Sequence, residues 1–133
     1  MKHIYALVDV NGMYAACEQV FNPKFRHMPL IVLSNNDGYC IALSSQAKAL
    51  GLSKFRPYFE LKPICDKFKV VVCSSNFALY LSLSEQLMNT IRRFSPRITA
   101  YSVDEAFLDL SGISSVHISM HGDHPITFKS IIQ

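Results

Sequence analysis

Three acidic residues stand where strand-forming segments end, and their types suit metal chemistry. Asp9 follows the apolar run Ile4–Val8, and the adjacent pair Asp104 and Glu105 separates two further runs of strand formers. A carboxylate beside a buried strand is costly unless it is paired, hydrogen-bonded or metal-bound. Carboxylate oxygens are ligands that Mg²⁺ prefers, and three of them can hold two ions for in-line phosphoryl transfer. The alternative is that these are solvated turn acids, because an Asp-Glu dipeptide is common.

The elements that would position these acids are the short strands and helices of an α+β domain. Apolar periodicity predicts a strand, a helix, a hairpin, two helices, a strand, a long helix and a second hairpin. The long helix starts after the capping candidates Ser75 and Asn76 and ends before Pro96. The segments are, in order, Ile4–Val8, Met13–Val20, Leu30–Leu33 with Tyr39–Leu43, Ser45–Leu50, Pro57–Asp66, Lys69–Cys73, Phe77–Phe94, and Ile98–Val103 with Ala106–Leu110.

The pattern weakens beyond Gly112. Residues 126–132 are compatible with either a short strand or a helix. Three histidines in this tail have helical i, i+4 and i+7 spacing, but Gly122 and Pro125 argue against a helix there. A polar tail is therefore expected rather than a metal site. The histidines are His117, His121 and His124.

The composition describes a chain that forms a hydrophobic core. Of 133 residues, 50% are apolar and 17% are charged, which excludes a disordered polar tail. No apolar run approaches the roughly 18 residues of a membrane span, and no cleavage site typical of a signal peptide follows the first strand. We therefore expect a soluble, cytoplasmic protein. The four cysteines form no CxxC pair, which favours free buried thiols over zinc ligands or disulfides.

The charge of the chain is distributed unevenly. The net charge is +3, but the segment from Lys24 to Lys69 holds eight basic residues against three acids, whereas acids outnumber bases elsewhere. A basic middle between acidic flanks suggests that carboxylates hold cations while another surface meets a polyanion. The alternative is a solvated lysine-rich surface.

Two motifs resemble the Y-family translesion DNA polymerases. They are LVDVNGMYAACE at Leu7–Glu18 and YSVDEAFLDL at Tyr101–Leu110. Three intervening motifs are similar to the UmuC branch (the polymerase V catalytic subunit), which includes the ImpB, MucB and SamB proteins. These motifs are SNNDG at Ser34–Gly38, AKALG at Ala47–Gly51 and SNFALY at Ser75–Tyr80. The resemblance runs from about Tyr5 to Gly112.

The resemblance implies roles for the residues around the first strand. Asp9, Asp104 and Glu105 match the carboxylates that hold two Mg²⁺ ions, and the backbone carbonyl of Val10 matches a contact to the nucleotide-side ion. Tyr14 matches the steric gate, whose ring excludes a ribose 2′-OH; without the family, Tyr14 would be interpreted as a core aromatic. The turn whose amides face the triphosphate matches Asn11, Gly12 and Met13.

The resemblance also implies nucleotide contacts in the inserted segment. Lys48 matches a basic residue that grips the triphosphate. Ser45 lies where many relatives have tyrosine, and Leu43 lies where closer relatives have arginine, so these two positions depart from the family. The small or apolar positions near the nascent base pair are Ile41 and Ala42, and the candidates for contact with template phosphate, otherwise solvated, are Lys54 and Arg56.

The implied architecture is a partial polymerase palm with a ferredoxin-like sheet and an inserted small α/β fingers segment. The palm takes residues 1–20 and 75–112, and the fingers take residues 21–74. Residues 113–133 form a divergent tail that we expect to be truncated or poorly ordered. We expect no counterpart within these residues of the thumb and little finger, which grip duplex DNA in the family.

The implied function is that of the N-terminal catalytic part of an error-prone translesion DNA polymerase, acting in SOS mutagenesis and DNA repair. Its substrates would be a DNA primer-template and dNTP, with a UmuD′-like dimer, a recombinase filament and a sliding clamp as partners and no membrane. We expect weak or no activity from these residues alone. Alternatives are a truncated remnant that binds nucleotide or a polymerase partner without catalysis, and another two-metal palm enzyme such as a nucleotidyl cyclase. Tyr14 and the NNDG-containing segment argue against the cyclase.

Overall fold

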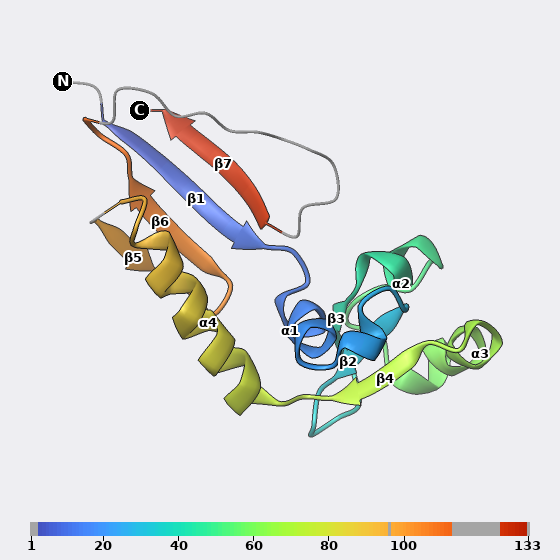
Figure 1. Cartoon of the computed structure of the whole chain (residues 1–133). Helices are drawn as coiled ribbons and strands as arrows, with labels where there is room; N and C mark the ends of the chain where they lie inside the picture. Colours follow the sequence, from blue (N-terminus) through green and yellow to red (C-terminus); the bar gives the residue numbers. More distant parts are fainter. Residues whose placement is uncertain (1–2, 96, 113–125, 133) are drawn as a thin grey trace. The chain divides into compact units, whose positions relative to one another are not determined.

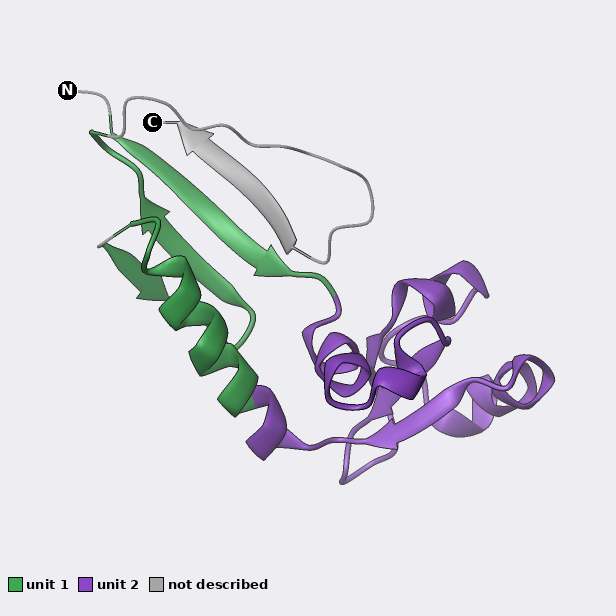
Figure 2. Ribbon diagram, in the orientation of Figure 1, with its two compact units in different colours: residues 1–11, 81–133 green, residues 12–80 purple. Residues whose placement is uncertain are grey.

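The computed structural model describes residues 3–95, 97–112 and 126–132. The chain divides into two compact units (Figure 2). Unit 1 combines the chain before Gly12 with the chain after Tyr80, and unit 2 is the continuous segment 12–80. Unit 2 therefore contains more than the predicted fingers 21–74. The assignment of residues to palm and fingers remains a prediction.

Unit 1 is built on a four-stranded antiparallel sheet (Figure 1). The strand order is β5-β6-β1-β7, so the four strands of this unit lie in the order second, third, first, fourth. This is the strand order of the ferredoxin-like sheet that the family resemblance implies. The strands are β1 (Ile4–Val10), β5 (Ile98–Ala100), β6 (Glu105–Asp109) and β7 (Ile126–Ile132).

The core of unit 1 lies between this sheet and helix α4 (Phe77–Ile91). Alternation along β1 buries Ala6 and Val8, while Ala106 and Leu108 of β6 face the same side. Met88 and Ile91 of α4 pack against them. Three apolar positions of the predicted helix, Phe77, Leu81 and Phe94, are instead exposed. The helix ends at Ile91, and Pro96 lies outside the described residues.

Strand β7 decides between the two interpretations of residues 126–132, a short strand or a helix. Residues Ile126–Ile132 form a strand that pairs antiparallel with β1 along its whole length. The interpretation as a helix is therefore wrong. The three histidines of the tail lie outside the described residues. Among the residues that are described, no helix is long and apolar enough to cross a membrane.

Unit 2 carries a three-stranded mixed sheet in the order β3-β2-β4. The predicted hairpin is confirmed, since β2 and β3 pair antiparallel, and β4 joins the other edge of β2 in parallel. The elements are α1 (Met13–Phe21), the 3₁₀ turn η1 (Pro23–Phe25), β2 (Leu30–Leu33), β3 (Cys40–Leu43), α2 (Ser45–Ala49), α3 (Tyr58–Phe68) and β4 (Val71–Ser74).

A buried serine joins the sheet of unit 2 to helix α2. The Ser44 hydroxyl accepts hydrogen bonds from the amide of Ala47, at 3.2 Å, and from the amide of Leu30, at 2.9 Å. Ser44 thus caps α2 and fixes the start of β2 with the same oxygen. This arrangement holds the helix that carries Ser45 and Lys48 against the hairpin.

All four cysteines are free, as the sequence predicts, and burial controls their reactivity. Burial raises the pKa of the Cys17 and Cys40 thiols to about 11, and it also raises the pKa of Cys65 and of the half-buried Cys73. At pH 8 only about 0.1% of a thiol with a pKa near 11 is thiolate. We expect a thiol reagent at pH 8 to modify Cys73 first, and Cys17 and Cys40 only after unfolding with guanidinium. Rapid labelling of all four in the native chain would contradict this.

Candidate metal and nucleotide site

The loop that carries Asp104 differs from the predicted two-residue turn. The strand predicted over Ile98–Val103 ends at Ala100, and Glu105 is already the first residue of β6. The connection is therefore the four-residue loop 101–104. Two backbone amides, of Tyr101 and Ser102, donate to the carbonyl of Glu105 at 3.0 and 3.2 Å. These hydrogen bonds begin the turn of the hairpin directly after Ala100, and the side-chain pattern does not reveal this.

Asp9 and Glu105 are direct partners across the sheet. They are paired Cα positions in the antiparallel β1–β6 register, so their side chains leave the same face. This is the face opposite Ala6, Val8, Ala106 and Leu108, and both acids are half-buried there. Like charges directly opposite each other destabilise a sheet, which makes this pair a place where a cation is favourable.

Asp104 lies close to Glu105 through a shared serine. The Ser102 hydroxyl is 2.8 Å from Asp104 Oδ1 and 3.2 Å from Glu105 Oε2. One hydroxyl proton can serve one carboxylate at a time, so the second carboxylate gains no full bond from Ser102. The backbone of Asp104 is fixed beside β1, because its carbonyl accepts from the Val10 amide at 2.9 Å. The loop thus places the Asp104 carboxylate beside that of Glu105, with one serine hydroxyl between them.

The donor set suits a hard divalent cation, but the ligands are not preassembled. All three side chains offer carboxylate oxygens, the ligand type of Mg²⁺. Among the described residues, no three His, Cys, Asp or Glu side chains are grouped closely enough to hold an ion as they stand. Asp9 and Glu105 share a face, and Asp104 and Glu105 share Ser102. Metal binding would therefore draw these side chains together by rotation.

Helix α4 supports the loop through Ser84. The buried Ser84 hydroxyl donates to the carbonyl of Val103, which precedes Asp104, at 2.6 Å. We expect Ser84→Ala to lower the free energy of unfolding by about 1–3 kcal/mol, because the carbonyl loses its partner. Urea denaturation measures this, with Ser82→Ala, exposed on the same helix, as the control. Equal stabilities of the two variants would show that the bond contributes nothing.

The predicted phosphate-binding turn lies at the start of α1. Gly12 has φ +58° and precedes the first helical residue, Met13, which is buried, while Asn11 is exposed. A Cβ on Gly12 would lie 2.5 Å from the carbonyl oxygen of Leu43, so the turn and the end of β3 are in close contact. Two candidate segments from distant parts of the sequence thereby meet.

The remaining candidates of unit 2 lie on β3, α2 and the segment before α3. Ile41 is half-buried, Ala42 is buried, and Ser45 and Lys48 are exposed. Lys54 and Arg56 are exposed too, but Arg56 pairs with Glu60. This ion pair engages the Arg56 guanidinium and so weakens its case as a phosphate contact. Lys54 has no ion pair within the described ranges.

The predicted gate residue Tyr14 lies in an aromatic cluster. Its ring stacks on that of Tyr80, with centroids 4.5 Å apart and planes 13° apart, and Phe77 contacts it edge-on. Tyr14 remains half-buried. From the sequence, Tyr80 is identified only as the last residue of the SNFALY motif, and no role is assigned to Glu18, Ser84 or Ser102. Glu18 could have been recognised as a neighbour of Tyr14, because residues four apart on the predicted helix lie on the same face.

Comparison with known proteins identifies the class and then the family. A Y-family DNA polymerase chimera of known structure superposes with a TM-score of 0.73 at 25% identity, covering 81% of this chain and 32% of that chain. Protein ImpB of Salmonella typhimurium is 48% identical over 111 residues, 84% of this chain and 26% of that protein. Protein UmuC of Salmonella typhimurium strain LT2 is 47% identical over 110 residues, 83% and 26% respectively.

The fold is therefore that of the Y-family DNA polymerases, in the part that carries the antiparallel sheet and the inserted unit. The model of the impB/mucB/samB family matches residues 8–121. The chain belongs to this family, as the three motifs between its first strand and second hairpin predict. It spans about a quarter of the length of the curated relatives it matches.

Proposed function

We propose that these residues form the catalytic palm and fingers portion of an error-prone translesion DNA polymerase. The observation that carries the proposal is the convergence of acids from distant segments. Asp9 and Glu105 are opposed across β1 and β6, and Asp104 is joined to Glu105 by Ser102. Two half-buried acids directly opposed across neighbouring strands are unfavourable without a cation.

The three carboxylates would hold two Mg²⁺ ions, together with the carbonyl of Val10. The ions would lower the pKa of the attacking hydroxyl and neutralise charge on the triphosphate. The protein's own contribution is to fix the acids: β1 and β6 fix Asp9 and Glu105, and the Val10 amide fixes the backbone of Asp104. Substrates in this proposal are a DNA primer-template and a dNTP.

The nucleotide would bind at the start of α1. Backbone amides of Asn11, Gly12 and Met13 would face the triphosphate, a suitable environment for an anion at a helix start. Lys48 would add positive charge from α2, and the ring of Tyr14 would lie under the sugar. Ser45 offers a hydroxyl donor where many relatives carry tyrosine.

The wider cellular role is proposed from the resemblance alone. It comprises SOS mutagenesis and DNA repair, with a UmuD′-like dimer, a recombinase filament and a sliding clamp as partners. The competing function is a non-catalytic protein that binds nucleotide or a polymerase partner. It would keep the fold and the triphosphate turn but would not need the acids.

Two assays test the proposal. Calorimetric titration of the 133-residue chain with dATP should give Mg²⁺-dependent binding that Asp104→Ala weakens. Residues 8–112 should also support primer extension when they replace the matching segment of a full-length UmuC, and Asp104→Ala in this graft should abolish it. An inert graft that still binds dATP would favour the non-catalytic alternative, and the absence of Mg²⁺-dependent binding would overturn the proposal.

Primer extension by the 133-residue chain itself is expected to be negligible. DNA affinity grows with the number of neutralised phosphates, and these residues correspond to about a quarter of the relatives' length. The primer end must also be held in attacking geometry, because misplacement is costly in rate. Robust Mg²⁺-dependent extension by the chain alone would show that these residues suffice.

A further inference from the structure

Three aromatic rings pack together where α1 meets the first turn of α4. Tyr14 and Tyr80 are stacked with centroids 4.5 Å apart. Phe77 contacts both rings edge-on, at 5.7 Å from Tyr14 and 6.0 Å from Tyr80. Tyr80 is fully buried, whereas Phe77 is 48% exposed. Tyr80 is therefore the fixed member on which the ring of Tyr14 rests.

The hydroxyl of Tyr80 is held by a carboxylate from the same helix that carries Tyr14. Tyr80 Oη donates to Glu18 Oε1 at 2.7 Å. Tyr14 and Glu18 are four residues apart on α1, so they lie on one face of it. One end of Tyr80 thus contacts Tyr14 and the other end contacts Glu18. This two-point attachment fixes both the position and the plane of the Tyr80 ring.

Glu18 forms no ion pair with any residue in the described part of the chain. Its negative charge instead adds to burial in raising the pKa of the Cys17 thiol to about 11 and that of Cys73. Burial, together with the hydrogen bond to Glu18, raises the pKa of Tyr80 as well, so the phenol stays protonated and remains a donor. A half-buried carboxylate with this environment acts as a strong acceptor for a phenol.

We propose that Glu18 and Tyr80 are positioning residues that fix the ring of Tyr14 and thereby set its discrimination against ribose. The sugar-sensing part rests on the function proposed for Tyr14 above; the fixing of the ring does not. A gate that works by exclusion requires a rigid ring, because a small displacement opens space for a 2′-OH. The buried Tyr80 ring supplies one wall, and Glu18 prevents Tyr80 from turning or sliding.

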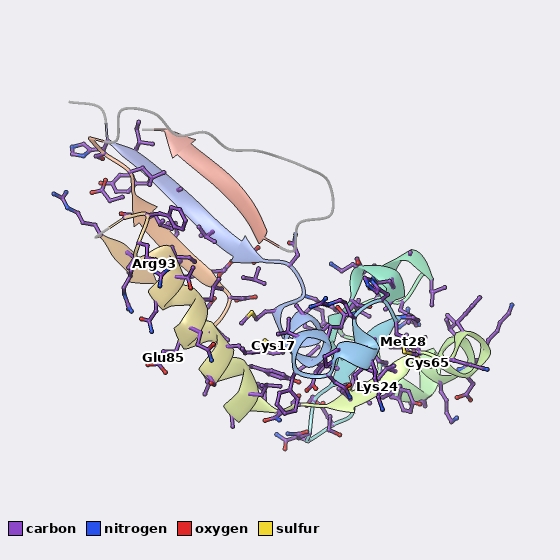
Figure 3. The ribbon with its side chains drawn as sticks, in the orientation of Figure 1. Cys17, Lys24, Met28, Cys65, Glu85 and Arg93 are labelled. Carbon is purple, nitrogen blue, oxygen red and sulfur yellow. The ribbon has the colours of Figure 1, made fainter. Side chains whose placement is uncertain are left out.

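The fixing of the ring is tested by ¹⁹F NMR on the chain labelled with 3-fluorotyrosine. The Tyr14 signal is assigned with Tyr14→Phe. Glu18→Gln and Tyr80→Phe should both shift or broaden this signal, because stacking geometry controls the ring-current shift. Glu85→Gln is the control, since Glu85 is exposed on α4 (Figure 3). An unchanged Tyr14 signal in folded Glu18→Gln and Tyr80→Phe proteins would overturn the proposal, whatever the chain binds.

The consequence for sugar discrimination is measured as the ratio of the dissociation constants for ATP and dATP with Mg²⁺. Loss of the Glu18–Tyr80 hydrogen bond should reduce this ratio by about threefold to tenfold. This is the effect expected when only part of the free energy of a hydrogen bond to a charged group acts on the position of the Tyr14 ring. The double variant should match either single variant, because the two residues act through one bond. A role confined to stability would lower the melting temperature and leave the ratio unchanged.

The outcomes separate this inference from the proposed function. Tyr14→Ala should remove the discrimination entirely. If Tyr14→Ala leaves the ratio unchanged, the gate assignment is wrong, and the NMR result alone decides whether Glu18 and Tyr80 fix the ring. If Tyr14→Ala removes the discrimination while Glu18→Gln and Tyr80→Phe preserve it, the positioning role is wrong and the gate assignment remains.

Discussion

Gly12→Ala should lower the free energy of unfolding by about 2–5 kcal/mol, the range for a left-handed non-glycine residue together with an overpacked contact. Gly12 has φ +58°, and an added Cβ would lie 2.5 Å from the carbonyl oxygen of Leu43. That atom belongs to the backbone of β3, so it cannot rotate away. A domain is typically stable by about 5–15 kcal/mol, so this single methyl group would remove a large fraction.

A second left-handed glycine separates the cost of the backbone conformation from the cost of the close contact. Gly38 has φ +67°, also in unit 2, but a Cβ there would meet nothing within 4 Å. Gly38→Ala should therefore cost only the left-handed conformation, about 1–2 kcal/mol. Urea denaturation followed by circular dichroism measures both variants. If the two substitutions cost the same, the close approach of Gly12 to Leu43 has no energetic weight.

Asp9→Asn should change stability with opposite signs in the absence and presence of Mg²⁺. Without metal, the variant removes a like-charged pair across β1 and β6 and should gain about 0.2–1 kcal/mol. With Mg²⁺ at ten times its dissociation constant, the wild-type chain should gain about 1.4 kcal/mol, and the variant should lose most of this gain. The stability order of the two proteins would then reverse.

Thermal unfolding with EDTA and with millimolar MgCl₂ measures the reversal. Glu105→Gln removes the other member of the pair and should behave in the same way. Glu85→Gln, which removes an exposed charge from α4, should respond to Mg²⁺ like the wild-type chain. Equal Mg²⁺ stabilisation of wild type and Asp9→Asn would exclude Asp9 as a ligand.

Local patterns predicted the elements well where a single segment carried its own signal. The apolar run at Leu30–Leu33 is β2 with the predicted bounds, and the turn signal at Ser34–Gly38 does join two antiparallel strands. The second hairpin was predicted less well, because Tyr101 and Val103 are strand formers by residue type but lie in the connecting loop. Its amides bond to the carbonyl of Glu105, and backbone bonds of this kind leave no trace in a side-chain pattern.

The acidic residues of the site could be predicted from the sequence, but the residues that hold them and Tyr14 in position could not. Asp9, Asp104 and Glu105 stood out because acids are unusual beside apolar strands. The residues that hold them or hold Tyr14 act across long sequence separations: Ser84 bonds to Val103, and Tyr80 bonds to Glu18, 62 positions away. A serine or glutamate on a helix face has no distinctive local pattern. The pairing of β7 with β1 was likewise a non-local feature.

The division of the chain has a consequence for the order of folding during synthesis. Unit 2 is continuous, so it can fold as soon as Tyr80 has left the ribosome. Strand β1 is made first but must wait for β6, since Glu105 is 96 positions beyond its partner Asp9. At ordinary translation rates that delay is roughly 5–20 s. The carboxylates therefore meet only after the inserted unit is complete, and during the delay β1 exposes unpaired backbone and the apolar side chains of Ala6 and Val8 to other chains.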